Sequence, residues 1–140
     1  MSADQFNVGL NMDPDVNERL SPEEQIEALA SFTLDCVLAA RGIRTSDVQR
    51  YVSVSRAQMV AYFAAQPRRA QAMLLKSGDT KPIHDVLCME SRDGKFVIYD
   101  MDHGEERNHC WYASLPEASA DFVAFRFDYY YPDGYGFQKD

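Results

Sequence analysis

The pattern of apolar residues changes once along this chain of 140 residues, at Ser77-Gly78-Asp79. Before that point apolar residues recur every three or four positions, as they do in helices. After it, short β-rich runs alternate with turn residues, as they do in antiparallel sheets. The order predicts an α+β domain in which an N-terminal helical layer of about three helices packs on a C-terminal antiparallel sheet of about four strands.

Capping signals delimit the first helix. Ser21 and Glu24 have capping-box spacing, and the proline between them suits the first helical position. Arg41-Gly42 supplies a cation for the last turn and a residue that accepts the left-handed conformation of a C-terminal cap. The sequence therefore predicts one helix over residues 22–41.

Two further capping-box spacings begin at Ser46 and Ser55. They predict shorter helices near residues 46–52 and 56–65. Pro67 is expected to end the second helix, because the residue before a proline is pushed out of the helical region. A further helical turn or two is expected after it.

Turn signals separate the strands of the second half. Asp93-Gly94 favours a tight hairpin, because glycine accepts a positive φ without a steric penalty, and a second turn is expected at residues 102–105. Ser114 is expected to cap one short helical turn before the last strand. The predicted strands cover residues 83–90, 95–101, 107–112 and 122–131.

Composition and the distribution of apolar residues indicate the domain organisation of the chain and its cellular location. Residues 1–20 have no sustained apolar period and predict an irregular arm, followed by a single domain over residues 21–140. The longest purely apolar run, residues 59–65, is far too short to cross a bilayer, and no basic flank precedes an apolar segment near the start. Three widely spaced cysteines predict reduced thiols, so we expect a cytoplasmic protein.

The charge is acidic overall but unevenly distributed. A net charge of −8 disfavours general affinity for nucleic acid or anionic membranes and favours a basic partner. Residues 36–76 nevertheless contain seven basic residues against one acidic residue, Asp47. This asymmetry indicates either a basic face for an anionic ligand, or a helical layer neutralised by the acidic sheet and arm of the same molecule.

Part of that basic stretch, residues 46–63, resembles a helix-turn-helix DNA-binding unit. Four apolar residues fall where such a unit needs contacts between its helices: Val48, Val54, Met59 and Tyr62. The resemblance implies that Ser55 opens the recognition helix and that Arg56 and Gln58 face DNA. The sequence departs from the usual pattern at Gln49 and Ser53, and two short capped helices packed on a sheet account for the same residues.

Residues 100–110 bring together two Asp, two Glu, two His and a Cys. A divalent metal uses such ligands, and a metal- or Cys-dependent enzyme would depend on His103, His109 or Cys110. The same residues also suit a polar hairpin turn, and alternation along a strand places His109 and Cys110 on opposite faces.

Other catalytic arrangements find little support. His84 and Cys88 would lie roughly 13 Å apart along a strand, beyond the reach of a Cys-His pair. No glycine-rich phosphate loop is present. We therefore predict no catalytic residues, no metal and no cofactor.

The C-terminal residues 128–137 contain four of the eight tyrosines, interleaved with acids. Tyrosine is enriched at interface anchors, and neighbouring carboxylates steer a basic partner. The alternative is that Tyr129 and Tyr131 fill the core while Tyr130 and Tyr135 cover an edge. The predicted partner-binding residues are Asp128, Tyr130, Asp133, Tyr135 and Phe137.

These observations predict a non-catalytic protein-binding or inhibitor domain that docks on a basic partner protein and occludes its site. In size and charge alone the chain is similar to acidic immunity proteins that neutralise toxins and to small phage inhibitors of nucleic-acid-binding proteins. The alternative function is a DNA-binding regulator that uses residues 46–63. A metal- or Cys-dependent enzyme is the third and least favoured function. No membrane partner is expected.

Overall fold

The structure is a computed structural model that describes residues 20–76, 86–136 and 138–139. The predicted arm therefore lies outside the described residues except for Leu20. His84 and Phe137 also lie outside them.

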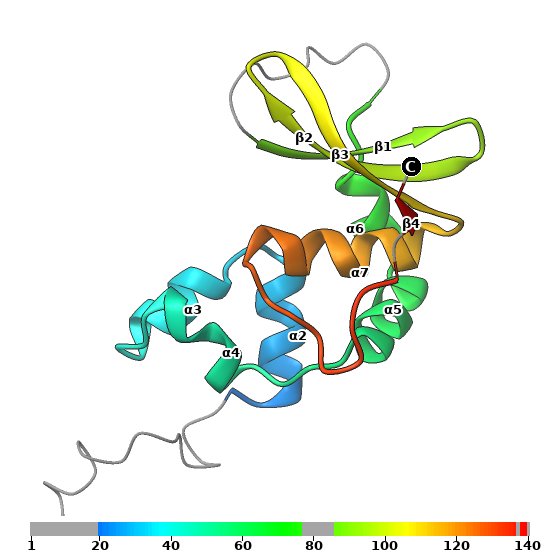
Figure 1. The fold of residues 1–140 in the computed structure, drawn as a ribbon. Coiled ribbons are helices and arrows are strands. Elements are labelled where there is room, and N and C mark those ends of the chain that lie inside the picture. Colours follow the sequence, from blue (N-terminus) through cyan, green and yellow to red (C-terminus); the bar gives the residue numbers. More distant parts are fainter. Residues whose placement is uncertain (1–19, 77–85, 137, 140) are drawn as a thin grey trace, which may run out of the picture.

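The described chain is α+β, with helices before strands and one long helix after them (Figure 1). The first half contains α2 (Pro22–Ala30), α3 (Leu34–Ala40), η2 (Thr45–Asp47), α4 (Val48–Tyr51), α5 (Arg56–Ala65) and α6 (Pro67–Ala72). The second half contains β1 (Val86–Arg92), β2 (Lys95–Asp102), β3 (Glu105–Tyr112), α7 (Leu115–Arg126) and β4 (Gln138–Lys139). None of the helices among these residues has the length and apolar character needed to cross a membrane.

Two of the three predicted capping boxes are confirmed, and the one at Ser46 is wrong, because α4 begins after Asp47 without a side-chain cap and the Gln49 side chain bonds to Tyr130 instead. The Ser21 hydroxyl accepts from the backbone N–H of Glu24 at 3.2 Å, and the Glu24 carboxylate accepts from the N–H of Ser21 at 3.1 Å. Ser55 and Gln58 exchange the same two bonds at 3.1 and 2.8 Å. These bonds satisfy N–H groups that have no partner inside the helix, so helix starts followed directly from local sequence.

The single helix predicted over residues 22–41 is wrong, because the chain breaks between α2 and α3. Phe32 adopts a left-handed φ of 59°. Its ring packs edge-on against Phe122, with the ring centroids 6.0 Å apart. The break redirects the chain so that Leu29 of α2 and Leu34 of α3 are both fully buried in one core.

The strand predicted over residues 122–131 is also wrong, because residues 115–126 form α7. Ser114 caps this helix, accepting from the N–H of Glu117 at 3.4 Å, and a proline lies in its first turn. Every residue from Ala118 to Ala124 is buried. A helix that is buried on all sides has no polar face, so its sequence shows no helical period. The run of apolar and aromatic residues in its second half therefore suited a strand equally well.

The sheet is antiparallel, in the order β1-β2-β3-β4. Its three long strands match three of the predicted strands, and the fourth, β4, contributes two residues that pair with Cys110 and Trp111. Both predicted hairpin turns are present, with positive φ at Asp93 and Gly94 and at His103 and Gly104. The predicted count of four strands is therefore slightly off, because the sheet has three long strands and β4 is a two-residue strand that was not predicted. The predicted count of about three helices is also slightly off, because the described chain before the sheet contains the five α-helices α2 to α6.

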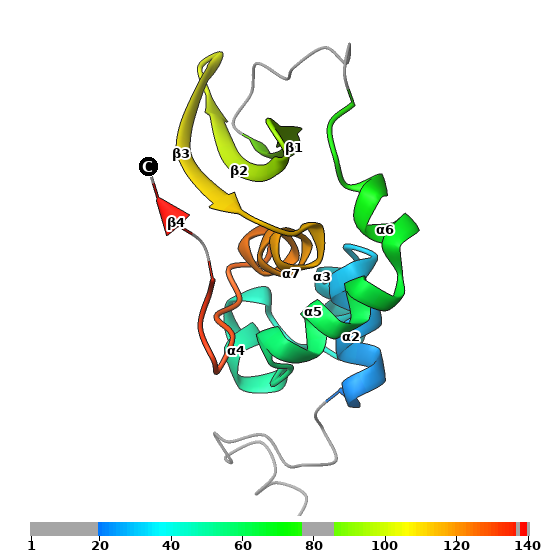
Figure 2. The same cartoon turned by 90° about the vertical axis from the view of Figure 1, so that its right-hand side faces the viewer.

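Helix α7 lies between the sheet and helices α2, α3, α4 and α5, and α6 lies beside it (Figures 1 and 2). On one side, Ala118 and Phe122 pack against Met89, Ile98 and other residues of the inner sheet face. On the opposite side, residues of α7 join the larger helical core, which includes Leu29, Leu34 and Phe63. The fold therefore has three layers, and α7 is the middle layer, which contributes residues to both cores.

Candidate functional site

The C-terminal segment, residues 128–136, follows α7 and turns back past α4 and α5 to reach the edge of the sheet (Figure 2). The side chain of Gln49 holds its first part, donating to the carbonyl oxygen of Tyr130 at 2.6 Å and accepting from its N–H at 3.0 Å. The segment therefore lies against the helical layer and does not continue the sheet.

Two tyrosines of this segment belong to the core. Tyr129 is fully buried and donates its hydroxyl to the carbonyl oxygen of Val54 at 2.8 Å. Tyr131 is 4% exposed and donates to the carbonyl oxygen of Ala120. Burial raises the pKa of Tyr129 to about 12. The expectation that Tyr129 and Tyr131 fill the core is confirmed.

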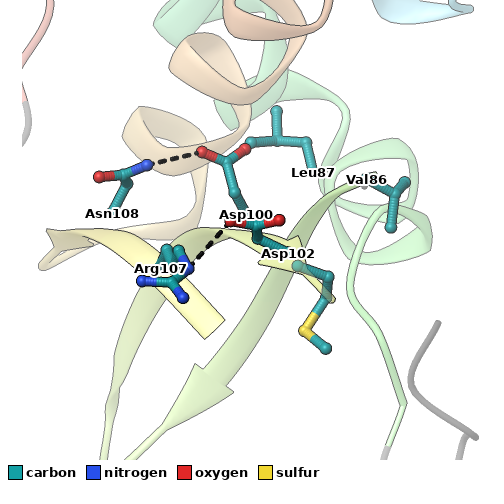
Figure 3. Close-up of a pocket in the computed structure, with 7 residues that line it drawn as sticks. Val86, Leu87, Asp100, Asp102, Arg107 and Asn108 are labelled. Atoms are coloured by element: carbon teal, nitrogen blue, oxygen red, sulfur yellow. Dashed lines mark hydrogen bonds and ion pairs between the residues drawn. The ribbon is translucent and has the colours of Figure 1, made fainter. Parts of the chain in front are cut away.

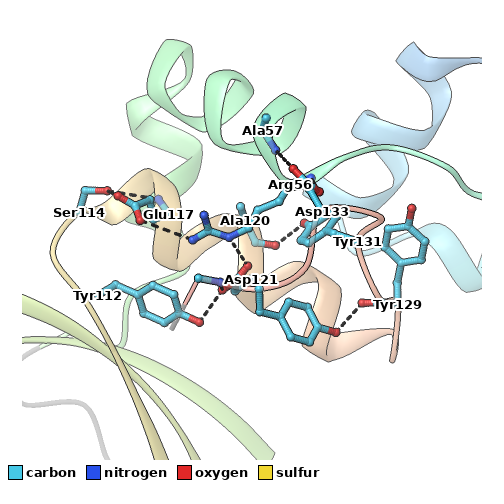
Figure 4. Close-up of polar contacts among 12 residues, drawn as sticks. Arg56, Ala57, Tyr112, Ser114, Glu117, Ala120, Asp121, Tyr129, Tyr131 and Asp133 are labelled. Carbon is cyan, nitrogen blue, oxygen red and sulfur yellow. Dashed lines mark hydrogen bonds and ion pairs between the residues drawn. The ribbon is translucent and has the colours of Figure 1, made fainter. Parts of the chain in front are cut away.

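The carboxylate of Asp133 is used within the chain, at the start of α5 (Figure 4). It accepts from the backbone N–H of Arg56 at 2.7 Å and from that of Ala57 at 3.1 Å. Burial opposes ionisation, but these hydrogen bonds outweigh it and lower the pKa of Asp133. Asp133 thus stabilises a helix start.

A buried carboxylate, Asp121 of α7, lies at the junction of the layers (Figure 4). It accepts from Arg56 Nε at 2.9 Å, from the Tyr112 hydroxyl at 2.8 Å and from the Gly136 N–H at 3.0 Å. Arg56 Nη2 also lies 3.5 Å from Glu117 Oε2. Burial opposes the charge on Arg56, but the hydrogen bonds and negative charges of Asp121 and Glu117 together outweigh it and raise the pKa of the guanidinium. Sequence reasoning missed Asp121, because nothing local distinguishes a buried acid from an exposed one.

This arrangement bears on the residues that resemble a helix-turn-helix. Helix α4 is a single turn, Val48–Tyr51, where such a unit has a full helix. The Arg56 side chain is only 16% exposed and faces the carboxylates of α7. The Gln58 side chain completes the capping box of α5. Both side chains expected to face DNA are therefore engaged in holding the fold.

Three of the seven basic residues of the stretch 36–76 are neutralised by acids of other helices. Arg41 pairs with Glu24 at 2.8 Å, and Arg69 pairs with Glu27 at 2.8 Å, so both acids come from α2. Arg56 pairs with acids of α7. Of the two explanations for the charge asymmetry, internal neutralisation accounts for these arginines, with helices supplying the acids in place of the expected sheet and arm.

The His- and Asp-rich residues 100–110 are spread over both faces of the sheet. His109 stacks between Tyr99 and Trp111 on the outer face and lies 2.9 Å from Glu106, whereas Cys110 packs on the inner face. The side chain of His103 is 84% exposed. Within residues 20–76, 86–136 and 138–139, no three His, Cys, Asp or Glu side chains are arranged to hold a metal ion. The pair His84–Cys88 is not tested, since His84 lies outside the described residues.

A groove in two parts lies along the sheet, and the C-terminal end of α7 lines one of the parts. One part is a cavity of about 450 Å³ lined by Leu87, Ile98, Asp100, Asn108, Cys110, Phe125, Asp128, Tyr130 and Tyr135. The other part, about 410 Å³, is lined by Val86, Leu87, Asp100, Met101, Asp102, Arg107 and Asn108 (Figure 3). The two share three residues and form one site, the acidic groove.

The charges of the acidic groove are only partly balanced. Arg107 is held at 3.0 Å by Asp102 and at 3.0 Å by Glu105. Asp100 accepts a hydrogen bond from the Asn108 amide at 3.1 Å (Figure 3). In the part of the chain that the structure describes, no cation pairs with Asp100 or Asp128.

The rim of the acidic groove is apolar. Tyr130 is 65% exposed and Val86 is 43% exposed, and these are the only large hydrophobic side chains classed as exposed among the described residues. Val86 lines one part of the groove and Tyr130 lines the other. The Tyr130 ring lies 5.5 Å from that of Tyr135, which in turn lies 4.6 Å from Phe125. An exposed tyrosine packed beside further rings is typical of an interface anchor.

Three of the five predicted partner-binding residues, Asp128, Tyr130 and Tyr135, therefore come together in the acidic groove. Asp133 points instead to α5, and Phe137 lies outside the described residues. The sequence grouped Asp100 with the candidate metal ligands of residues 100–110 and not with Asp128, because their sharing of one cavity depends on the packing of α7 against the sheet. No protein-family model, no curated protein and no solved structure matches the chain, so its function has to be inferred from the geometry of the groove itself.

Proposed function

We propose that this protein is a non-catalytic binding domain that docks on a basic partner protein through the acidic groove and occludes the partner's functional site. One observation carries the proposal. Asp128 and the exposed ring of Tyr130 line the same cavity as Asp100 of β2, and no described cation neutralises either carboxylate. Unneutralised acids beside an exposed aromatic side chain suit a cationic protein surface.

The two kinds of residue have different roles in such a complex. Carboxylates at the groove, together with the net charge of −8, accelerate the encounter with a basic surface. Tyr130 and Tyr135 supply large, rigid contact areas that lose little entropy on binding, so they slow dissociation. Inhibition then needs only steric occlusion, without a catalytic group on this chain.

The proposed partner is a basic toxin or a nucleic-acid-binding protein in the cytoplasm. Both kinds of protein carry cationic surfaces that contact phosphate groups, and an acidic surface competes for them. The internal ion pairs of Arg41, Arg56 and Arg69 fit a protein whose available charge is negative.

A low-salt pull-down from native lysate, split into nuclease-treated and untreated halves, tests the proposal. The tagged protein is compared with its Tyr130→Ala and Asp128→Asn variants. Asp93→Asn is the matched control, because Asp93 is also an exposed aspartate with a left-handed φ, 51° against 54° for Asp128, and it lies in the β1–β2 turn. All variants are first checked for an unchanged unfolding transition.

We expect one basic protein to be retained in both halves by the original chain and by Asp93→Asn, and to be lost with Tyr130→Ala and Asp128→Asn. Retention of the same protein by both groove variants would overturn the proposal, as would the absence of any retained protein. Nucleic acid retained only in the untreated half would favour the DNA-binding alternative instead.

A further inference from the structure

The larger cavity of the acidic groove is lined by both apolar and acidic side chains. Leu87 and Ile98 of the sheet and Phe125 of α7 supply aliphatic and aromatic surface, whereas Asp100 and Asp128 supply carboxylates. A side chain that fits both has a long aliphatic stem and a cationic head, because its methylene groups pack on the walls while its head reaches the acids.

We infer that this cavity is the socket for an arginine side chain of the partner protein, which inserts its guanidinium between Asp100 and Asp128. The inference rests on the proposed function and deepens it, since it names the chemical group that the groove recognises. A buried arginine anchor is also the residue type that most often dominates binding energy at protein interfaces, together with tyrosine and tryptophan.

The rings at the cavity favour arginine over lysine. Tyr130 and Tyr135 both line it, with their rings tilted by 39° and centred 5.5 Å apart. A guanidinium is planar, stacks on aromatic faces and binds a carboxylate with two parallel hydrogen bonds. An ammonium is a strongly hydrated point charge that does neither as well.

Electrostatics also favours a cation at this place. Among the described residues, Asp100 has the Asn108 amide as its hydrogen-bond donor, and Asp128 is paired with no cation. The arginine that is nearby, Arg107, lines the other part of the groove and is already held by Asp102 and Glu105. An inserted guanidinium therefore gains two charge-assisted partners without displacing an internal ion pair.

Capped tripeptides test the inference by NMR titration of the full chain labelled with nitrogen-15. The probes are acetyl-Gly-Arg-Gly-amide, the same peptide with lysine, and the same peptide with citrulline, which has the shape of arginine without its charge. Butylguanidinium is a fourth probe that separates a small guanidinium ligand from a peptide side chain. Asp100→Asn and Asp128→Asn are the test variants, and Asp93→Asn is the control.

We expect the arginine peptide to shift the amide signals of Asp100, Asn108, Asp128 and Tyr130. The citrulline peptide should bind at least roughly tenfold more weakly than the arginine peptide, the ratio expected when a charge-assisted hydrogen bond is lost. The affinity of the lysine peptide should lie between those two. Both test variants should weaken arginine binding, and Asp93→Asn should not. Equal binding of citrulline and arginine, or shifts confined to other residues, would overturn the inference.

The remaining outcomes separate the inference from the proposed function. If the arginine peptide does not bind but the retained protein still depends on Tyr130, the docking surface stands and the arginine socket is wrong. If the arginine peptide binds and no protein is retained from lysate, the docking function is wrong. Butylguanidinium binding more tightly than the peptide would contradict an occupant supplied by a protein.

Discussion

Arg56 Nε of α5 lies 2.9 Å from Asp121 Oδ1 of α7, although 65 residues separate them in the sequence. Asp121 is fully buried, and its second oxygen accepts from Tyr112 of β3 and from the backbone of Gly136. One carboxylate therefore ties the helical layer, the sheet and the C-terminal segment together, and the stability of all three depends on it.

Asp121→Asn is expected to lower the free energy of unfolding by about 3 kcal/mol, because removing one partner of a buried ion pair leaves the other charge poorly compensated. Urea denaturation followed by circular dichroism measures the change. Ser119→Ala is the matched control, since Ser119 is equally buried on α7 and its hydroxyl has no hydrogen-bond partner among the described residues. The control should be neutral or slightly stabilising, and an equal loss in both variants would contradict the role of the pair.

Gly136→Ala is expected to destabilise the protein by about 1–3 kcal/mol, the usual effect of overpacking. A Cβ at this position would clash with Arg56 Cζ, and Asp121 and Glu117 hold that guanidinium in place. The destabilisation should disappear on a background carrying Arg56→Ala and Asp121→Asn, where neither the obstructing group nor an unpaired buried carboxylate remains. A double-mutant cycle measured by urea denaturation detects this, and an unchanged loss on that background would refute the steric explanation.

Asp133→Asn is expected to reduce stability at neutral pH by about 1 kcal/mol and to have a smaller effect in acid. The pKa of Asp133 is lowered in the folded state, so its contribution is present above the ordinary value of 3.8 and is lost as the pH falls through the folded value. Unfolding curves between about pH 7 and pH 3 should therefore converge for the two proteins at the acid end. A constant difference across this range would show that the charge of Asp133 is not what matters.

Tyr129→Phe is expected to destabilise the protein at neutral pH by about 1 kcal/mol, because the carbonyl oxygen of Val54 loses its donor. The pKa of Tyr129 is raised from 10.0 to about 12, so its stabilising effect is complete below pH 10 and is lost as the pH rises to 12. Alkaline unfolding curves of the two proteins should thus approach each other in that window. Parallel curves would contradict the assignment of the shift to Tyr129.

Local chemistry was sufficient for the helix starts at Ser21 and Ser55 and for the hairpins, but not for the starts of α3 and α4. The capping boxes at Ser21 and Ser55 and the turn at Asp93-Gly94 form with the geometry that their residue types require, because each depends on atoms within a few positions of one another. The break at Phe32 was not predictable in the same way. Its left-handed φ is maintained by packing against Phe122, a residue from the other end of the chain.

The sequence by itself determined the α+β class, the helix caps, the hairpin turns and the gathering of acids and tyrosines after residue 127. Only the tertiary structure decided that residues 115–126 form a helix buried on both sides, that Asp121 receives Arg56, and that Asp128 shares a groove with Asp100. The physical reason is the sequence separation of the residues that interact. Caps and turns are local hydrogen-bonding choices, whereas the burial of a helix and the meeting of two carboxylates depend on how distant layers pack.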